Sequence, residues 1–493
     1  MPVFSTQGGL AFEKVPFTNS AGWYTISTTN NNFNDFVFES DGSNIHLATQ
    51  SPDGFTNKPS YGYSLIDNSG LLPSVPFSRS WNIYSLASPP GVRIDSIEGE
   101  CFAVAVEENP GSSNNPILGG YIYGNTSVAG QQFGNLYHNV ILDGPQGNPN
   151  ASVEFDILQP NDYQTITRIE NVSANTSYVM GTFVTNNGGI GPPKTPPNHV
   201  LFFQEIDTTL FVDPVGTSRT RYLTTIDGTY AVGDYDTEKP EDLQVDSNGS
   251  VILTYNTLDP LLNEKIATIG KINIVGVTGV QNAWGITIYN DTSQTLTITQ
   301  AAIDSNDNVY VVLYEDQGHT SYIVKTSSSG VVQYRQKMIN AKLTSIVCDQ
   351  SDNIYVGGTD NLTKINIAKL DSSGNIVWQN SLYYSGSYGN VLNKMKIFDN
   401  YLYLCGNAIL ASNGKGFMAK VPLNGSIPGN GSYGSVTYGT SVQAFLAPVS
   451  NLITTLNSAT SVYPTRLGGL GYTAADPSAS SATPIAINNT AIA

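Results

Sequence analysis

The sequence is poor in charged residues. Only 12% of its 493 residues are Asp, Glu, Lys or Arg, about half of what a typical soluble domain contains. Acidic residues exceed basic ones, 39 against 22, and the net charge is −17. Binding to phosphate backbones or anionic lipid requires clusters of Lys and Arg, and the sequence has no such cluster. We therefore expect no nucleic-acid partner.

Cysteine, histidine and long apolar runs are also scarce. The three cysteines, Cys101, Cys348 and Cys405, cannot all pair, and each lies in an apolar or aromatic run. This predicts free thiols that pack as small apolar side chains. The four histidines fit no metal-binding pattern, so we expect neither metal nor cofactor. No apolar run has the length of a membrane helix, and the first residues, MPVFSTQGGLAFEKV, do not resemble a secretory leader.

The abundant residues are those of turns and strands, and one turn motif recurs. The segments LQVDSNGSVIL, AIDSNDNVYVV and IVCDQSDNIYV each place an apolar run before an Asp-rich turn and a β-branched run after it. Asp246, Asp304 and Asp349 open these turns. Asp and Asn favour hairpin turns because their side chains bond the local backbone. The pattern predicts hairpins, and a cation-binding loop is the alternative.

A second motif follows each hairpin. In KINIVG, KTSSSG, KLDSSG and KVPLNG a Lys lies five residues before a Gly, which predicts a third strand, a Gly turn and a fourth strand. Units of four short strands repeated every 45 to 60 residues are typical of β-propeller blades. Weaker versions of the unit occur in the first half of the chain. The clear units cover 240–290, 298–340, 341–385 and 390–440.

These clear units resemble the bacterial β-propeller repeat family whose units read V-D-S-x-G-N-x-Y-V. The segments 303–311 and 348–356 match it best, and the resemblance covers about 240–425. It implies an all-β fold, a single β-propeller of seven four-stranded blades, with an extended C-terminal tail. The domain prediction is a closing segment at 1–30, a propeller at 31–440 and a packing or anchoring tail at 441–493.

Two terminal features carry separate predictions. A strand from residues 1–30 would complete the last blade and close the ring. In the tail, Phe445, Val449, Leu452, Ile453 and Leu456 have near-helical spacing, which predicts a short packed helix. The low-complexity stretch that follows needs a surface to order on, either the protein's own or a neighbour's, and the second possibility favours assembly with other proteins.

Catalytic motifs are not apparent. The sequence has no nucleophile elbow and no phosphate-binding glycine loop. Asp35, Asp95, Asp246, Asp304 and Asp349 could approach a common axis, but repeat turns account for most of them. We therefore predict no catalytic residues and no enzyme, with a polysaccharide-degrading propeller as an alternative.

Aromatic residues beside amides suit contacts with sugars, because rings pack on sugar faces and amides bond hydroxyls. Packing between blades is the alternative role. The candidate recognition surface consists of Tyr121, Tyr123, Asn125, Lys194, Asn198, Tyr383, Tyr384 and Tyr388.

The low charge, the abundance of Asn, Thr, Ser and Gly, and the simple tail resemble the virion proteins of tailed bacteriophages. The resemblance implies a structural protein of the tail, fibre or baseplate, assembled in the host cytoplasm. Its expected partners are other virion proteins, copies of itself and a host-surface glycan or protein. Avidity would come from repeated weak contacts. A bacterial surface propeller that binds glycans or proteins is the alternative.

Overall fold

The computed structural model contains strands and no helices in the residues that it describes. It therefore contains, within those residues, no helix that could span a membrane. The described residues are 3–7, 10–17, 22–27, 30–52, 59–71, 78–81, 92–107, 115–128, 131–141, 163–173, 176–185, 198–207, 221–225, 239–259, 264–275, 279–290, 295–315, 320–360, 364–410, 414–427, 431–433, 435–440, 445–447, 452–457 and 463–465.

The strands form seven antiparallel sheets, which we number in chain order. Sheet 1 contains β4 (Asn32–Phe38), β5 (Asn44–Pro52), β6 (Pro59–Asp67) and β7 (Ser78–Trp81). Sheet 2 contains β8 (Val92–Glu107), β9 (Asn115–Val128) and β10 (Gln131–Ile141). Sheet 3 begins with β11 (Tyr163–Ser173), β12 (Thr176–Thr185), β13 (Asn198–Asp207) and β14 (Arg221–Thr225). Sheet 4 begins with β15 (Lys239–Val245), β16 (Val251–Asp259), β17 (Glu264–Val275) and β18 (Gly279–Asn290).

The remaining sheets follow the same order. Sheet 5 begins with β19 (Leu296–Ile303), β20 (Val309–Glu315), β21 (Thr320–Thr326) and β22 (Val332–Ile339). Sheet 6 begins with β23 (Ala341–Cys348), β24 (Ile354–Asp360), β25 (Ile365–Leu370) and β26 (Ile376–Tyr384). Sheet 7 contains β27 (Gly389–Phe398), β28 (Tyr401–Ile409) and β29 (Gly414–Pro422).

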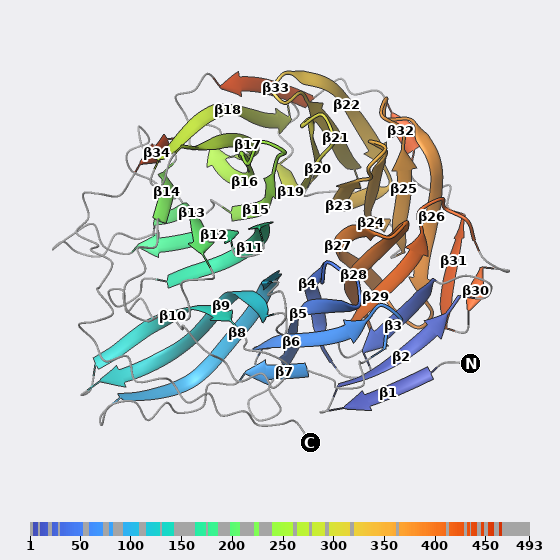
Figure 1. Ribbon diagram of the computed structural model, residues 1–493, viewed down its shortest axis with the longest axis horizontal. Coiled ribbons are helices and arrows are strands. Elements are labelled where there is room, and N and C mark those ends of the chain that lie inside the picture. Colours follow the sequence, from blue (N-terminus) through green and yellow to red (C-terminus); the bar gives the residue numbers. More distant parts are fainter. Residues whose placement is uncertain are drawn as a thin grey trace.

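The sheets are arranged radially, and the first strand of each lies innermost (Figure 1). These inner strands β4, β8, β11, β15, β19, β23 and β27 contact one another in order, and β27 contacts β4 to complete the circle. The protein is therefore an all-β propeller, as the repeats predicted. The observed strand numbers per sheet are not uniformly four, however, because sheet 2 has three described strands and five sheets have more than four.

Apolar side chains fill the space between neighbouring sheets. Successive strand residues point to opposite sides, so alternate residues of one sheet face the next sheet. Val311 of β20, for example, packs against Ile252 of β16, whereas its neighbours Tyr310 and Val312 pack towards sheet 6. Full burial of such a side chain contributes about 1.5–3 kcal/mol. Two of the three cysteines, Cys101 and Cys405, are buried as predicted, and Cys348 is half-buried.

The N-terminal segment belongs to sheet 7. The strand β3 (Trp23–Ser27) pairs with β29 and supplies a fourth strand, and β2 (Leu10–Pro16) and β1 (Val3–Gln7) extend the sheet outward. Hydrogen bonds then join sheet 7 to sheet 1: the amide of Asn393 donates to the carbonyl of Phe33 at 2.7 Å, and the Thr25 hydroxyl donates to the carbonyl of Gly70 at 2.7 Å. The chain thus closes its own ring with residues from both ends.

The C-terminal segment adds outer strands to four sheets in reverse order. Its first hairpin, β30 (Ser432–Tyr433) and β31 (Val436–Thr440), pairs with β26 of sheet 6. Then β32 (Phe445–Ala447) pairs with β22, β33 (Leu452–Asn457) with β18, and β34 (Tyr463–Thr465) with β14. Figure 1 shows these strands on the outer rim of the ring.

This arrangement corrects two sequence predictions. The described parts of 445–456, residues 445–447 and 452–456, form strands and not a helix, because the outer sheet edges offer unpaired backbone groups to these residues. The unit predicted at 390–440 is divided, since its last strand, β31, belongs to sheet 6 and β3 takes its place in sheet 7.

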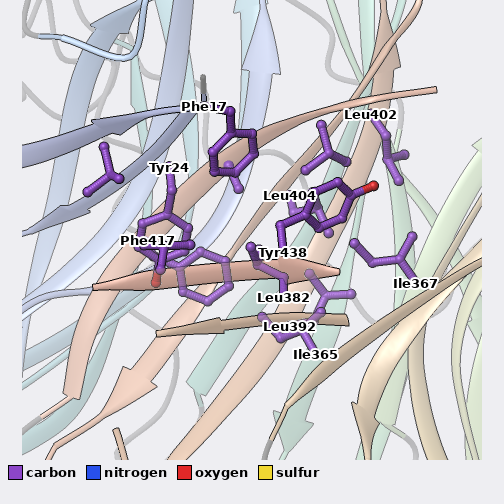
Figure 2. Packing of buried hydrophobic residues seen from close by; sticks show 14 of the residues in the cluster. Phe17, Tyr24, Ile365, Ile367, Leu382, Leu392, Leu402, Leu404, Phe417 and Tyr438 are labelled. Atoms are coloured by element: carbon purple, nitrogen blue, oxygen red, sulfur yellow. The ribbon is translucent and has the colours of Figure 1, made fainter. Parts of the chain in front are cut away.

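Both ends of the chain meet in one core cluster (Figure 2). Phe17 and Tyr24 of the N-terminal segment pack with Leu392 and Phe417 of sheet 7 and with Tyr438 of β31. All these side chains are almost fully buried. The cluster fixes sheet 7 against sheet 6 and so holds the inner strands of both in place.

Candidate functional site

Each inner strand carries a β-bulge at the same height. The pairing register shifts within each of the seven inner strands, for example between Pro240 and Asp242 in β15 and between Leu392 and Lys394 in β27. Bulges re-aim the side chain that follows them. We call the residues directly after the bulges the floor residues: Asp35, Ala103, Arg168, Asp242, Gln300, Ser345 and Lys394.

Four floor residues form the same type of hydrogen bond between their own sheet and the next one. The side chain accepts a hydrogen bond from the backbone N–H one residue beyond the next floor residue. The donors and acceptors are Val104 to Asp35 at 3.4 Å, Ala301 to Asp242 at 3.0 Å, Ile346 to Gln300 at 3.2 Å, and Met395 to Ser345 at 2.9 Å. The repeated bond aligns the inner strands and gives the axis a regular lining.

Lys394 leaves this pattern and crosses the axis. Its Nζ, on sheet 7, donates to Asp242 Oδ1 on sheet 4 at 3.1 Å, and Arg168 Nε of sheet 3 lies 3.4 Å from the same oxygen. The second oxygen of Asp242 accepts from Gln244 Nε2 and from the Ala301 N–H, each at 3.0 Å. Both Asp242 and Lys394 are buried. This cluster therefore joins sheets 3, 4 and 7 at the level of the floor residues.

A second ring lies two residues further along each inner strand, on the side of the Asp turns. Residues two apart in a strand point to the same side, so these residues point the same way as the floor residues, towards the next sheet; Ala302 and Val347, for example, pack in the clusters between neighbouring sheets. We call them the mouth residues: Val37, Ala105, Glu170, Gln244, Ala302, Val347 and Lys396. Five of them are half-buried, Ala105 and Ala302 being the exceptions.

Glu170 and Lys396 are the charged mouth residues. Lys396 Nζ lies 5.9 Å from the centre of the Phe36 ring. Desolvation raises the pKa of Glu170 and outweighs the opposing effect of Lys396 and Lys394. The mouth residues therefore comprise one carboxyl, one ammonium, the amide of Gln244 and four apolar side chains of Val and Ala.

The Asp turns around this mouth explain both sequence motifs. Asp304 Oδ1 accepts hydrogen bonds from the N–H groups of Asn306 and Asn308, each at 2.9 Å, and its other oxygen accepts from the Tyr310 hydroxyl at 3.1 Å. Lys325, the Lys of the second motif, lies 3.6 Å from that oxygen. Despite desolvation, these hydrogen bonds lower the pKa of Asp304.

The same contacts recur in two other units. Lys271 lies 2.6 Å from Asp246, and Lys369 lies 4.0 Å from Asp349. Donors surround each turn carboxylate, which suits a hairpin turn and not a cation. The hairpin prediction is thereby confirmed. Among the described residues, no group of three or more His, Cys, Asp or Glu could hold a metal ion.

Neighbouring turns are also joined directly. The Ser247 hydroxyl donates to Asp307 Oδ2 at 2.7 Å, and the Ser305 hydroxyl donates to Asp352 Oδ2 at 2.9 Å. These bonds extend across sheets 4, 5 and 6 and make the rim of the mouth a connected surface.

The structure distributes the predicted recognition residues over several sheets. Tyr121, Tyr123 and Asn125 lie in β9 of sheet 2 and Asn198 begins β13 of sheet 3, but their side chains fall outside the described part, as does all of Lys194. Of the three tyrosines near sheet 7, only Tyr388 presents an exposed ring, at 70%.

The other two tyrosines are half-buried. Tyr384 stacks on Tyr24 at 5.9 Å, so it contributes to packing, and Lys364 Nζ lies 6.0 Å from the ring of Tyr383. Of the aspartates considered from the sequence, Asp35 is a floor residue, and Asp246, Asp304 and Asp349 lie at turns. The side chain of Asp95 is outside the described part.

No protein-family model matches the chain, and no curated protein matches it. Solved structures with similarity include a glycosyl hydrolase from Bacteroides ovatus, with a TM-score of 0.26, 10% identity, and coverage of 51% of this chain and 82% of that one. A sialidase from Trypanosoma rangeli has a TM-score of 0.29 and 9% identity over 71% of this chain. The isopeptidase AtxE2 has a TM-score of 0.24 and 10% identity over 77% of this chain.

The chain spans 56% of the sialidase and 58% of the isopeptidase. At such low TM-scores and identities, the similarities carry no argument about function.

Proposed function

We propose that this protein is a non-enzymatic structural propeller of a tailed-phage particle. It would lie in the tail, fibre or baseplate and serve as a docking platform, a host-surface recognition module, or both. Its partners would be other virion proteins, copies of itself and a host-surface glycan or protein. The low charge and the polar, uncharged composition support this setting. The seven sheets would be seven blades, which the order of the inner strands supports.

The proposal that the protein is not an enzyme rests on the small number of carboxyl groups among the mouth residues. Glycoside hydrolysis typically requires two carboxyl groups roughly 5–9.5 Å apart. Glu170 is the one carboxyl among the mouth residues, and Asp35 and Asp242 on the floor are buried and hydrogen-bonded. A binding role needs no second carboxyl.

A hydrolase remains the second candidate because two carboxyls on neighbouring inner strands have raised pKa values. Desolvation raises the pKa of Glu100 to about 7, which would suit a general acid. However, Glu100 lies three residues before its floor residue and Glu170 two residues after its own. At the rise of a strand this places them roughly 13–16 Å apart in height, beyond the range of a catalytic pair.

Two measurements test the proposal. Mass spectrometry of density-purified particles should find the chain at a fixed ratio to a capsid or tail protein. Recovery only in the soluble or cell-surface fraction would contradict the virion assignment and favour a bacterial surface propeller. A panel of fluorogenic glycosides should give no turnover. Turnover that Glu170→Gln abolishes in a folded protein would establish the enzyme instead.

A further inference from the structure

Asn248 and Asn306 occupy the same place in two neighbouring Asp turns. The backbone N–H of Asn248 donates to Asp246 Oδ1 at 2.9 Å in the turn of sheet 4. The backbone N–H of Asn306 donates to Asp304 Oδ1, also at 2.9 Å, in the turn of sheet 5. Both asparagines are exposed. The two turns therefore allow one asparagine to be compared with another in the same backbone geometry.

The side chains of the two asparagines also make the same contact. Asn248 Nδ2 donates to Asp307 Oδ2 in the turn of sheet 5 at 3.0 Å. Asn306 Nδ2 donates to Asp352 Oδ2 in the turn of sheet 6 at 3.3 Å. Each asparagine side chain thus joins its own turn to the turn of the next sheet.

The residue that follows each asparagine is different. Gly249 follows Asn248 and Asp307 follows Asn306, and both of these following residues have a positive φ, of 76° and 59°. Each donates its N–H to the carbonyl of the Asp that opens its turn, at 3.0 Å in both cases. The glycine differs in having no Cβ beside its backbone nitrogen.

We propose that Asn248 is a site of spontaneous deamidation, which uncouples the turn of sheet 4 from that of sheet 5. The backbone nitrogen of Gly249 attacks Cγ of Asn248 and forms a C–N bond, which closes a succinimide ring. The bond from Cγ to Nδ2 breaks, and the side-chain amide leaves as ammonia with the proton of the Gly249 N–H. Solvent water then opens the ring at one of its two carbonyl carbons and gives aspartate or isoaspartate at position 248.

The space around Gly249 favours ring closure at Asn248 over ring closure at Asn306. A Cβ built on Gly249 would meet nothing within 4 Å, so the Gly249 peptide has room to rotate towards the asparagine side chain. Asp307 is held in place, because its carboxylate accepts from the Ser247 N–H at 3.0 Å and from the Ser247 hydroxyl at 2.7 Å. Its Cβ also crowds the nitrogen that would have to attack.

Deamidation reverses the interaction between the two turns. Asn248 donates to Asp307, whereas an ionised carboxylate at position 248 can only accept and is repelled by Asp307. An isoaspartate also adds one carbon atom to the backbone of the turn. The contacts of Ser305 and Asn306 with Asp352 are unaffected. The modification therefore loosens the contact between the turns of sheets 4 and 5 and leaves that between sheets 5 and 6.

The first test is peptide mapping by mass spectrometry after the full chain has been incubated at mildly alkaline pH. Position 248 should be deamidated several-fold faster than position 306, which is an internal control in the same sample. Gly249→Asp copies the natural turn of sheet 5, where Asp307 has a similar φ. This variant should reduce the rate at position 248 to that at position 306, and circular dichroism verifies its fold.

Hydrogen exchange of the fresh and the incubated protein tests the structural consequence. The amides of 246–250 and 304–308 should exchange faster after deamidation, and those of 349–353 should be unchanged. The inference is wrong if positions 248 and 306 are deamidated at equal rates, or if Gly249→Asp leaves the rate at position 248 unaltered. Exchange that is the same before and after modification would overturn the uncoupling. The inference does not depend on the proposed particle assignment, which none of these results would affect.

Discussion

The ring of Phe17 lies parallel to that of Tyr438, with 5.8 Å between their centres and an angle of 3°. The two residues come from opposite ends of the chain and meet between sheets 6 and 7. Asn380 of β26 donates to the Tyr438 hydroxyl at 2.8 Å, so the ring is held at both its face and its tip. The closed ring therefore depends on side chains that are distant in sequence.

Truncating Tyr438 should destabilise the whole propeller. Tyr438→Ala removes a fully buried ring, which typically costs about 3–5 kcal/mol of the free energy of unfolding. Tyr438→Phe should cost about 1 kcal/mol, since only the hydrogen bond with Asn380 is lost. Urea unfolding monitored by tyrosine and tryptophan fluorescence measures both.

The control for this prediction is Tyr388→Ala, at an exposed ring. It should change the free energy of unfolding by less than about 0.5 kcal/mol. Equal effects at positions 438 and 388 would contradict the proposed role of the Phe17–Tyr438 contact.

Substitutions at two glycines distinguish the contribution of backbone conformation to stability from that of side-chain packing. Gly425 and Gly249 have similar positive φ values, 72° and 76°. A Cβ on Gly425 would lie 2.5 Å from Cδ2 of Trp378, whereas a Cβ on Gly249 would meet nothing within 4 Å. Gly249→Ala should cost about 1–2 kcal/mol from conformation alone, and Gly425→Ala should cost roughly 1–3 kcal/mol more through overpacking.

Thermal unfolding of the two variants compares them directly. A smaller loss of stability in Gly425→Ala than in Gly249→Ala would show that the Trp378 ring moves aside easily. In that case the Gly turn of the second sequence motif would be needed for its φ value and not for the close approach.

The ion cluster on the floor should show coupling between its members. Lys394→Met leaves the buried Asp242 carboxylate with less compensation, which typically costs about 3–5 kcal/mol. Adding Asp242→Asn removes the charge left behind, so the double variant should be more stable than the two single losses predict. A double-mutant cycle from urea unfolding measures this coupling. Strict additivity would mean that the Lys394–Asp242 contact does not stabilise the axis.

Much of the fold could be predicted from the sequence because its signals are local. The Asp turns and the Lys-to-Gly spacing each report on residues that are neighbours in one hairpin, and both were placed correctly for sheets 5 and 6. The strands near the C-terminal end were harder to predict from the sequence. The apolar residues at 445–456 suit a helix or a strand, and the outer edges that select the strand lie far away in sequence.

The axial site could not be predicted for a similar reason. Asp242 lies in the segment PEDLQV, and its partner Lys394 lies in NKMKIF on another sheet. The neighbouring residues in the sequence do not indicate that Asp242 or Lys394 lies near the propeller axis. Aligning the seven inner strands on their apolar residues would have revealed a column of Asp, Arg, Gln, Ser and Lys at the floor position. Finding that column requires knowing where each bulge lies, which the structure provides.

The buried Glu39 side chain should control the acid stability of sheet 1. Its Oε2 accepts hydrogen bonds from the Ser43 hydroxyl at 2.8 Å and the Asn44 amide at 2.7 Å, and its Oε1 lies 3.0 Å from His46 Nε2. The other ring nitrogen of His46 lies 2.7 Å from the Tyr63 hydroxyl. Burial alone would raise the pKa of Glu39, but these contacts outweigh it and lower the pKa to about 2.

The sign of the pH effect follows from this lowered pKa. Above about pH 4.3, where an unfolded Glu ionises, both states are ionised and the stabilisation is fully present. As the pH falls towards 2, the unfolded chain takes up a proton before the folded protein does, and the stabilisation is lost. Urea unfolding of the natural chain and of Glu39→Gln should therefore differ most near neutral pH, and the difference should shrink between about pH 4.3 and 2. A difference that stays constant over this range would mean that Glu39 is not ionised in the folded protein.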